Sequence, residues 1–291
     1  MATQTIDMND VQTCTFNNQS VSEIYLNSTK IWPVTPGIQY FTIEALGSIE
    51  LVLRDGFDGS IEYSTDNGTT WNGPIDASMA NYSIYGSKIL LRGTSNTTFW
   101  DNVESRSAIY IGANYDFTVS GDIETLLDYQ TVVNGNHPVP ANYCFQNLFN
   151  GYTHLVDASD LILSYNTSEY CYSSFFNGCS ALVNPAQHPA QNVATYAYNS
   201  CYYNCISLIK LPSIYAVNVG VSAFRYMFRY CSSIKMSQTQ TGEYVNEYRV
   251  PPSGTATYGS TPGNNAFQYT SGTYKTALVP NTTYYTSNQV V

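Results

Sequence analysis

An internal repeat with a step of about 26 residues constrains the fold of this chain more than any other feature. Four segments align without gaps, at residues 143–155, 170–182, 196–208 and 222–234. Each carries an aromatic residue, a cysteine and an aliphatic residue in the same order, except that Tyr152 replaces the cysteine in the first. The columns are Phe149, Phe176, Tyr202 and Phe228; Cys179, Cys205 and Cys231; and Leu155, Leu182, Leu208 and Ile234. This regularity predicts units that stack and share a core.

Each repeat is interpreted as a helix-like half followed by a strand-like half. Phe145, Leu148 and Phe149 have the i, i+3, i+4 spacing of one helix face, and Gly151 follows where a C-terminal cap would lie. The apolar residues from Leu155 then predict a short strand. A unit of this length with one helix and one strand is typical of a leucine-rich-repeat coil. We expect an α/β solenoid of about four to five such coils, with caps, over residues 119–291.

Residues 37–118 have the pattern of an all-β domain. Short alternating or β-branched segments, separated by Gly, Asn and Asp turns, are typical of a β-sandwich. These segments lie at residues 39–45, 48–53, 60–64, 80–85, 88–93 and 108–112. We therefore expect a β-sandwich domain before the repeats.

One hairpin in this region matches the Asp-box pattern S-x-D-x-G-x-T-W. Asn67 and Gly68 suit the positive φ angles of a tight turn, and Asp66 is placed to accept hydrogen bonds from backbone amides. The motif occurs in sialidases, but the arginine cluster and the repeated blades of a sialidase are missing from this sequence. We interpret the motif as a structural hairpin. Its residues are Ser64, Asp66, Gly68, Thr70 and Trp71.

Residues 1–36 form a short leader that contains one candidate β-hairpin. Two alternating segments flank Asn27 and Ser28, which are typical turn residues. A lone hairpin is not stable in water, so it packs either on the next domain or on another protein, and stability alone leaves both open. Its apolar residues are Ile24, Tyr25, Leu26, Ile31 and Trp32.

The composition excludes several classes of protein. The 291 residues carry 11 basic and 21 acidic side chains, a formal net charge of −10. The few dispersed basic residues give no cationic footprint for a nucleic acid, and no apolar run is long enough to span a membrane. The start lacks the basic and apolar regions of a secretory signal, so we expect none. The seven cysteines are odd in number, which disfavours a disulfide framework, and we expect buried thiols.

No group of residues has the spacing of a catalytic or metal site, so we expect no enzyme activity, no metal and no cofactor. The histidines match no nucleophile or HExxH motif. Asp55, Asp58 and Glu62 fit turn-forming loops better than a glycosidase pair or a calcium loop.

Tyrosine, which occurs 27 times, is the main candidate for a binding surface. Its side chain combines a large contact area and a polar tip with little conformational entropy, which suits sugar or protein ligands. About half of the tyrosines in the repeats fall in the repeat columns and are expected in the core. The candidate ligand face consists of Tyr165, Tyr172, Tyr198, Tyr215 and Tyr230.

The repeats resemble BspA-type leucine-rich repeats, whose pattern is aromatic-x-x-[MF]-F-x-x-C-[ST]-x-L. The segments YCYSSFFNGCSALVNPA and FRYMFRYCSSIK carry this likeness. The preceding segments YFTIEAL, IEYSTDNGTTW, KILLRG and FTVSGDIETLL are similar to the β domain that precedes such repeats in surface proteins of gut anaerobes and their phages. The resemblance covers roughly residues 37–291. It implies adhesion, or contact with a protein or glycan, without enzyme activity.

The leader is similar to the N-terminal attachment segment of phage fibre and decoration proteins. This resemblance implies a virion protein of a phage of gut bacteria, such as one of the crAss-like group: a head fibre, a tail fibre or a capsid decoration protein. The hairpin residues 24–26 and 31–32 would then contact other capsid or tail proteins. The repeats would contact a neighbouring subunit or a host glycan or protein, and a homo-oligomer is expected, a trimer by analogy.

Two alternatives stay open. A bacterial cell-surface adhesin would share the fold, and its gene would encode an upstream lipobox segment. A carbohydrate-active enzyme would need two carboxylates in one cleft.

Overall fold

The computed structural model describes residues 14–16, 19–21, 24–26, 29–32, 38–79 and 81–291. The chain divides into two units, Met1–Gln39 and Tyr40–Val291, which are described separately. In the first unit, β1 (Cys14–Phe16) pairs with β2 (Gln19–Val21), and β3 (Ile24–Leu26) pairs with β4 (Thr29–Trp32), both antiparallel. The turn expected at Asn27 and Ser28 lies outside the described residues. The candidate attachment residues Ile24, Tyr25 and Leu26 are in β3, and Ile31 and Trp32 are in β4.

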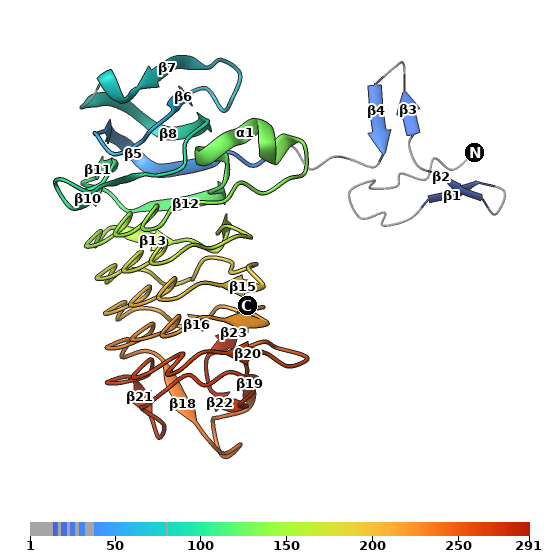
Figure 1. The fold of residues 1–291 in the computed structure, drawn as a ribbon, viewed down its shortest axis with the longest axis vertical. Helices are drawn as coiled ribbons and strands as arrows, with labels where there is room; N and C mark the ends of the chain where they lie inside the picture. Colours follow the sequence, from blue (N-terminus) through green and yellow to red (C-terminus); the bar gives the residue numbers. More distant parts are fainter. Residues whose placement is uncertain (1–13, 17–18, 22–23, 27–28, 33–37, 80) are drawn as a thin grey trace. The chain divides into compact units, whose positions relative to one another are not determined.

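The second unit begins with an eight-stranded sheet, which lies above a stack of repeat units in Figure 1. Its order is β13-β12-β5-β8-β6-β7, with β11 also paired to β5 and β14 to β12. The boundary expected between residues 118 and 119 falls inside β12. The strands are β5 (Phe41–Leu53), β6 (Ser60–Ser64), β7 (Asn72–Asp76), β8 (Tyr82–Thr94), β11 (Ile109–Gly112), β12 (Phe117–Asp122), β13 (Leu155–Asp157) and β14 (Leu161–Ile162).

The prediction of a β-sandwich is wrong, because the main strands run through the turns that were expected to separate them. The segments at 39–45 and 48–53 form the single strand β5, and those at 80–85 and 88–93 form β8. These two long strands pair along their length, with one irregularity between Glu44 and Ile49 that absorbs the intervening glycine. A second, two-stranded sheet contains only β9 (Trp100–Asp101) and β10 (Arg106–Ser107).

The α-helix of the described residues, α1 (Thr125–Val133), packs on β8 of the sheet. The approach is so close that a Cβ at Gly93 would overlap the carbonyl oxygen of Leu126. Asn96 reinforces the contact, because its side-chain amide donates a hydrogen bond to that same carbonyl at 3.0 Å. A 3-10 turn, η2 (Ala77–Met79), lies at the other end of β8.

The repeats contain consecutive tight turns where helices were expected. Amides in each unit alternate between two kinds of acceptor: the carbonyl three residues earlier, and a carbonyl of the next unit. For example, the Leu148 amide donates to the Phe145 carbonyl at 3.2 Å, whereas the Phe149 amide donates to the Phe175 carbonyl at 2.9 Å. An α-helix satisfies its amides internally, four residues back, so this pattern excludes one.

A left-handed residue at every fourth position generates these turns. In the first unit the positive φ angles fall at Tyr143, Asn147 and Gly151. Two successive turns therefore span four residues of the chain. Apolar side chains at positions i, i+3 and i+4 all point into the interior, as they do on one face of a helix. The spacing of Phe145, Leu148 and Phe149 consequently predicted a helix, although all three are buried in a turn structure.

Two columns of aromatic rings run through the stacked units. Phe149, Phe176, Tyr202, Phe228 and Phe267 form one column, with centroid separations of 5.5, 5.2, 5.6 and 5.8 Å and interplanar angles of at most 15°. Phe41 of β5 continues this column into the sheet at 6.3 Å. The second column contains Phe99, Phe145, Tyr172, Tyr198 and Phe224.

The cysteine and aliphatic columns lie beside the rings. The thiols of Cys179, Cys205 and Cys231 donate hydrogen bonds to the carbonyls of Phe149, Phe176 and Tyr202, at 2.9, 3.1 and 2.9 Å. Each cysteine thus joins its own unit to the preceding one, and burial raises the pKa of these thiols, which keeps them protonated. The aliphatic column Leu155, Leu182, Leu208 and Ile234 is fully buried.

Short strands complete the stack. Parallel pairing joins β15, β17 and β20, and β23 near the end of the chain returns to pair with β16. A four-stranded sheet, β19-β22-β18-β21, covers the last unit. The strands are β15 (Asn192–Val193), β16 (Lys210–Leu211), β17 (Asn218–Val219), β18 (Lys235–Ser237), β19 (Asn246–Tyr248), β20 (Thr257–Tyr258), β21 (Ser271–Gly272), β22 (Tyr284–Thr286) and β23 (Gln289–Val290).

The expected fold class, an α/β solenoid of leucine-rich-repeat coils, is therefore wrong. The described residues form a mostly β structure with several small sheets, and their single α-helix precedes the repeats. The physical reason is the left-handed residue at every fourth position, since it interrupts each helical turn.

Replacing Gly93 with alanine is expected to destabilise the second unit by about 2 kcal/mol or more, because the new methyl group displaces α1 from β8. Urea unfolding followed by circular dichroism measures the change. Gly112→Ala is the control, since its nearest neighbours would lie at an ordinary 3.6 Å. Equal stability of the two variants would contradict the close approach.

Candidate interaction surface

Exposed and half-buried tyrosines from successive units stack on one another along the outside of the repeats. Tyr143 stacks on Tyr170 at 5.1 Å, and Tyr170 stacks on Tyr196 at 4.7 Å, with interplanar angles of 7° and 5°. These rings belong to the first left-handed position of each unit, so the turn directs them outward.

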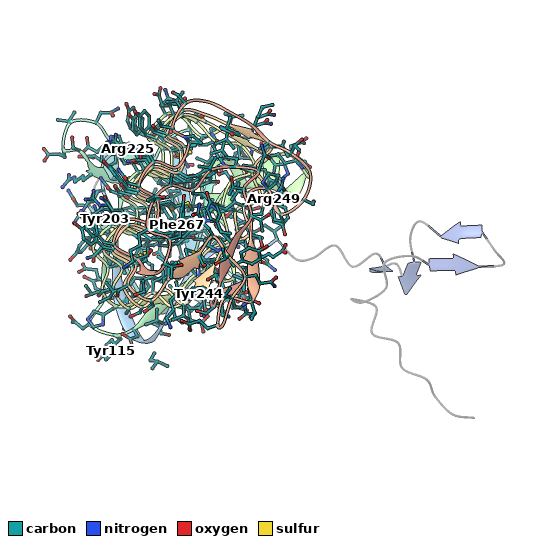
Figure 2. The ribbon with its side chains drawn as sticks, turned by 90° about the horizontal axis from the view of Figure 1, so that it is seen from below. Tyr115, Tyr203, Arg225, Tyr244, Arg249 and Phe267 are labelled. Carbon is teal, nitrogen blue, oxygen red and sulfur yellow. The ribbon has the colours of Figure 1, made fainter. Side chains whose placement is uncertain are left out.

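The outer row continues into a cluster of arginines and tyrosines. Arg225 donates a hydrogen bond to the Tyr226 hydroxyl at 2.9 Å. The guanidinium carbon of Arg229 lies 4.9 Å from the Tyr226 ring centroid and 5.1 Å from that of Tyr230. Tyr203 and Tyr269 complete its surroundings at 5.9 and 5.3 Å. Figure 2 shows Arg225 and Tyr203 along one side of the stack, with Phe267 further inside.

We call this set the tyrosine–arginine surface. It consists of Tyr143, Tyr170, Tyr196, Tyr203, Arg225, Tyr226, Arg229, Tyr230 and Tyr269.

Six of these tyrosines have a positive φ, which is an unfavourable conformation for a bulky residue. The last left-handed position of the units is Gly151, Gly178 and Asn204 in the first three and Tyr230 and Tyr269 in the last two. Glycine and asparagine adopt that conformation readily, whereas a residue such as tyrosine costs about 1–2 kcal/mol. Three of the six strained tyrosines, Tyr226, Tyr230 and Tyr269, lie in the arginine cluster, and backbone strain of this kind tends to collect at functional sites.

In the part of the chain that the structure describes, the two arginines of the surface have no carboxylate partner. Among the described residues, neither Arg225 nor Arg229 has a carboxylate within salt-bridge distance, although the chain carries a net charge of −10. The hydrogen bond from Arg225 lowers the pKa of Tyr226. The surface is therefore a locally cationic, aromatic region on an acidic protein.

The residues of the expected ligand face do not come together. Tyr172 and Tyr198 are fully buried in the second aromatic column, so their assignment to an exposed face is corrected. Tyr165 is exposed but stacks on His137 at 3.9 Å. Tyr215 lines a separate cavity of about 400 Å³. Only Tyr230 belongs to the tyrosine–arginine surface, where it stacks on Tyr269 at 4.6 Å.

The Asp-box residues form the tight hairpin turn expected from the motif. The Asp66 carboxylate accepts hydrogen bonds from the Thr70 amide at 2.9 Å and the Thr70 hydroxyl at 2.6 Å. The Ser64 hydroxyl donates to Asp66 and accepts from the Gly68 amide. These bonds, above all that of the Thr70 hydroxyl, lower the pKa of Asp66 to about 2. Trp71 packs edge-on against Tyr40 at 4.7 Å.

Two of the other candidate carboxylates, Asp58 and Glu62, have structural partners. Asp58 accepts hydrogen bonds from the amides of Thr97 and Thr98, and Glu62 pairs with Arg92 at 2.8 Å. Within the described ranges, His, Cys, Asp and Glu side chains do not gather in threes that could hold a metal ion. None of the described helices has the length and apolar character needed to cross a membrane.

A separate cleft lies away from the tyrosine–arginine surface, between β11 and the first repeat unit. It has a volume of about 880 Å³ and a polar lining that includes Glu50, Arg54, Tyr110 and His154. Arg54 lies over the ring of Tyr110 at 4.2 Å, and Glu50 accepts hydrogen bonds from Ser83 and Tyr85. The Nδ1 atom of His154 lies 3.1 Å from the carboxylate of Asp116, so the polar groups of this cleft have partners within the protein.

A scan against protein-family models and searches of curated proteins and of solved structures gave no match. The role of the surface is therefore argued from its geometry.

The sequence analysis did not single out the arginines of the cluster, although residues four apart, such as Arg225 and Arg229, would also be neighbours on a helix. The signal that identifies them is the four-residue step: with it, Arg225 and Arg229 each precede a left-handed tyrosine.

Replacing Thr70 with valine is expected to raise the pKa of Asp66 from about 2 towards its ordinary value of 3.8, because the largest stabilising hydrogen bond is lost. In the unaltered protein the bonded carboxylate stabilises the hairpin above about pH 4, and that contribution disappears as the pH falls through about 2. NMR titration of the carboxyl group measures both midpoints. Thr69→Val is the control, since the Thr69 hydroxyl donates to the Asp66 backbone carbonyl instead; an equal shift there would refute the assignment.

Proposed function

We propose that the chain is a non-enzymatic binding protein whose tyrosine–arginine surface contacts a glycan or protein partner. The observation that carries this proposal is the coincidence of three properties at one place: exposed stacked rings, arginines without carboxylate partners, and bulky residues in a left-handed conformation. Stacking does not require a bulky residue at the last turn position, because Gly151, Gly178 and Asn204 occupy that position in other units.

The rigidity of the scaffold supports the same role. The two aromatic columns and the hydrogen bonds between units fix the spacing of the surface side chains, so little side-chain entropy is lost on binding. Rigid tyrosine-rich surfaces are effective in recognition for this reason.

We further propose that the protein acts as a virion structural protein, attached through the first unit to capsid or tail proteins. This part rests on the resemblance of the leader to phage attachment segments and on the separation of Met1–Gln39 from the second unit. Several copies on one particle would convert weak single contacts into firm attachment.

Full-length protein is expected to bind gut-bacterial cells or their isolated surface polysaccharides without changing the polysaccharides. Tyr170→Asn should weaken binding severalfold, because asparagine suits the left-handed turn but removes the ring between Tyr143 and Tyr196. Tyr258→Asn, at an exposed tyrosine of β20 outside the surface, is the control. Binding is measured by sedimentation with cells, and polysaccharide size by chromatography. Release of shorter products, or equal binding by all three proteins, would refute the proposal.

The attachment role has its own test. Electron cryomicroscopy of purified phage particles should locate the repeat stack on the particle exterior. Absence of the chain from intact particles would exclude the virion assignment.

A further inference from the structure

We propose that Arg225 and Arg229, with the rings of Tyr226, Tyr230 and Tyr269, form a binding site for an acidic sugar, one that carries a carboxylate or a sulfate. This inference rests on the proposed function and specifies the ligand class of the same surface.

The first argument is the unbalanced positive charge. Both guanidinium groups contact one ring: their central carbons lie 4.5 Å (Arg225) and 4.9 Å (Arg229) from the centroid of Tyr226. Two like charges held on one ring repel each other, and no carboxylate of the described residues compensates them. A bound anion would relieve that repulsion.

The second argument is an unused hydrogen-bond donor. The Nε–H group of Arg229 is buried and has no acceptor among the described residues. Two other arginines have acceptors: the Nε of Arg92 donates to Glu62, and Arg249 donates to the carbonyls of Pro251 and Gly254. The Nε of Arg106 also lacks a hydrogen bond, but it lies 3.6 Å from the carboxylate of Asp101, whereas Arg229 has no such carboxylate within the described ranges. Planar guanidinium groups match carboxylate and sulfate oxygens in paired hydrogen bonds, so an oxyanion is the ligand group that suits Arg229.

The third argument is the aromatic platform around the charge. Tyr230 and Tyr269 stack at 4.6 Å and remain 36% and 53% exposed. The parts of these rings that the stacking leaves exposed offer apolar surface to the C–H side of a sugar ring, while the hydroxyl groups and arginines bind its polar edge.

Charge on the whole chain favours a small acidic group over a long polyanion. With a net charge of −10, the protein repels extended polyanions such as nucleic acid, and the cationic region contains only two arginines. The site therefore suits one or two acidic sugar residues within a glycan.

Binding is measured by calorimetry on the full-length protein at low ionic strength, with three probes of similar length. An oligogalacturonate supplies carboxylates, a sulfated maltohexaose supplies sulfates without carboxylates, and maltohexaose itself is neutral. At least one acidic probe is expected to bind, more weakly as salt increases, and maltohexaose is expected to bind at least about tenfold more weakly. The two acidic arms show which anion the site prefers.

Two variants connect binding to the site. Arg229→Lys keeps the charge but loses the paired hydrogen bonds, so it should weaken acidic-probe binding about tenfold. Tyr269→Asn should weaken it too, while its melting temperature stays equal or rises, because asparagine relieves the left-handed strain at φ +62°. Arg54→Lys is the matched control, since Arg54 also lies over a tyrosine but on the sheet.

Several outcomes would overturn the inference. Equal binding of maltohexaose and the acidic probes, lost in Tyr269→Asn, would leave the binding surface in place and refute the acidic ligand. Acidic-probe binding that Arg229→Lys leaves unchanged would also refute it. No binding of any probe would refute the acidic-sugar site, while the cell-binding assay with Tyr170→Asn would still decide whether the surface binds a partner.

Discussion

The repeat half of this protein depends on backbone hydrogen bonds whose acceptors alternate between the same unit and the next unit. Every second amide of a unit donates to the next unit, as the Phe149 amide does to Phe175, and the amides between them close tight turns within the unit. Neither set alone would hold the chain: the turns satisfy only half of the donors, and the other half needs a neighbour. Stacking is therefore a requirement of each unit's own backbone, to which the aromatic columns add burial.

The sequence predicted which residues of the repeats align in columns, but it did not predict the backbone conformation of each repeat. The aromatic, cysteine and aliphatic columns could be predicted because a constant step in the sequence places equivalent residues in equivalent environments. The local conformation could not, because an apolar pattern of i, i+3 and i+4 arises both on a helix and in turns that repeat every four residues. The residues at the left-handed positions distinguish the two conformations. Glycine at 151 and 178 indicates a left-handed turn, whereas tyrosine at positions such as 143 and 170 gives no such indication.

Similar reasoning applies to the sheet and to the candidate site. The short alternating segments correctly predicted strands. They did not predict that β5 and β8 continue through their glycines, because no residue pattern indicated the irregularity in the pairing of these strands. Composition identified tyrosine as the main candidate for a binding surface. It could not distinguish Tyr172 and Tyr198, which are buried in the core, from Tyr203 and Tyr269, which lie around Arg229. That distinction depends on which side of the turn a residue occupies, and therefore on the backbone.

The cysteine column has a consequence for how such a protein changes over time. Cys179, Cys205 and Cys231 each donate to a carbonyl of the preceding unit, so three successive junctions use the same bond. A duplicated unit inserted between two of these units could form the same thiol–carbonyl hydrogen bond with the unit before it and with the unit after it. Unequal recombination can therefore add or remove whole units between the sheet and β16, whereas a unit inserted after β16 would separate the contacts that the end of the chain makes with two neighbouring units.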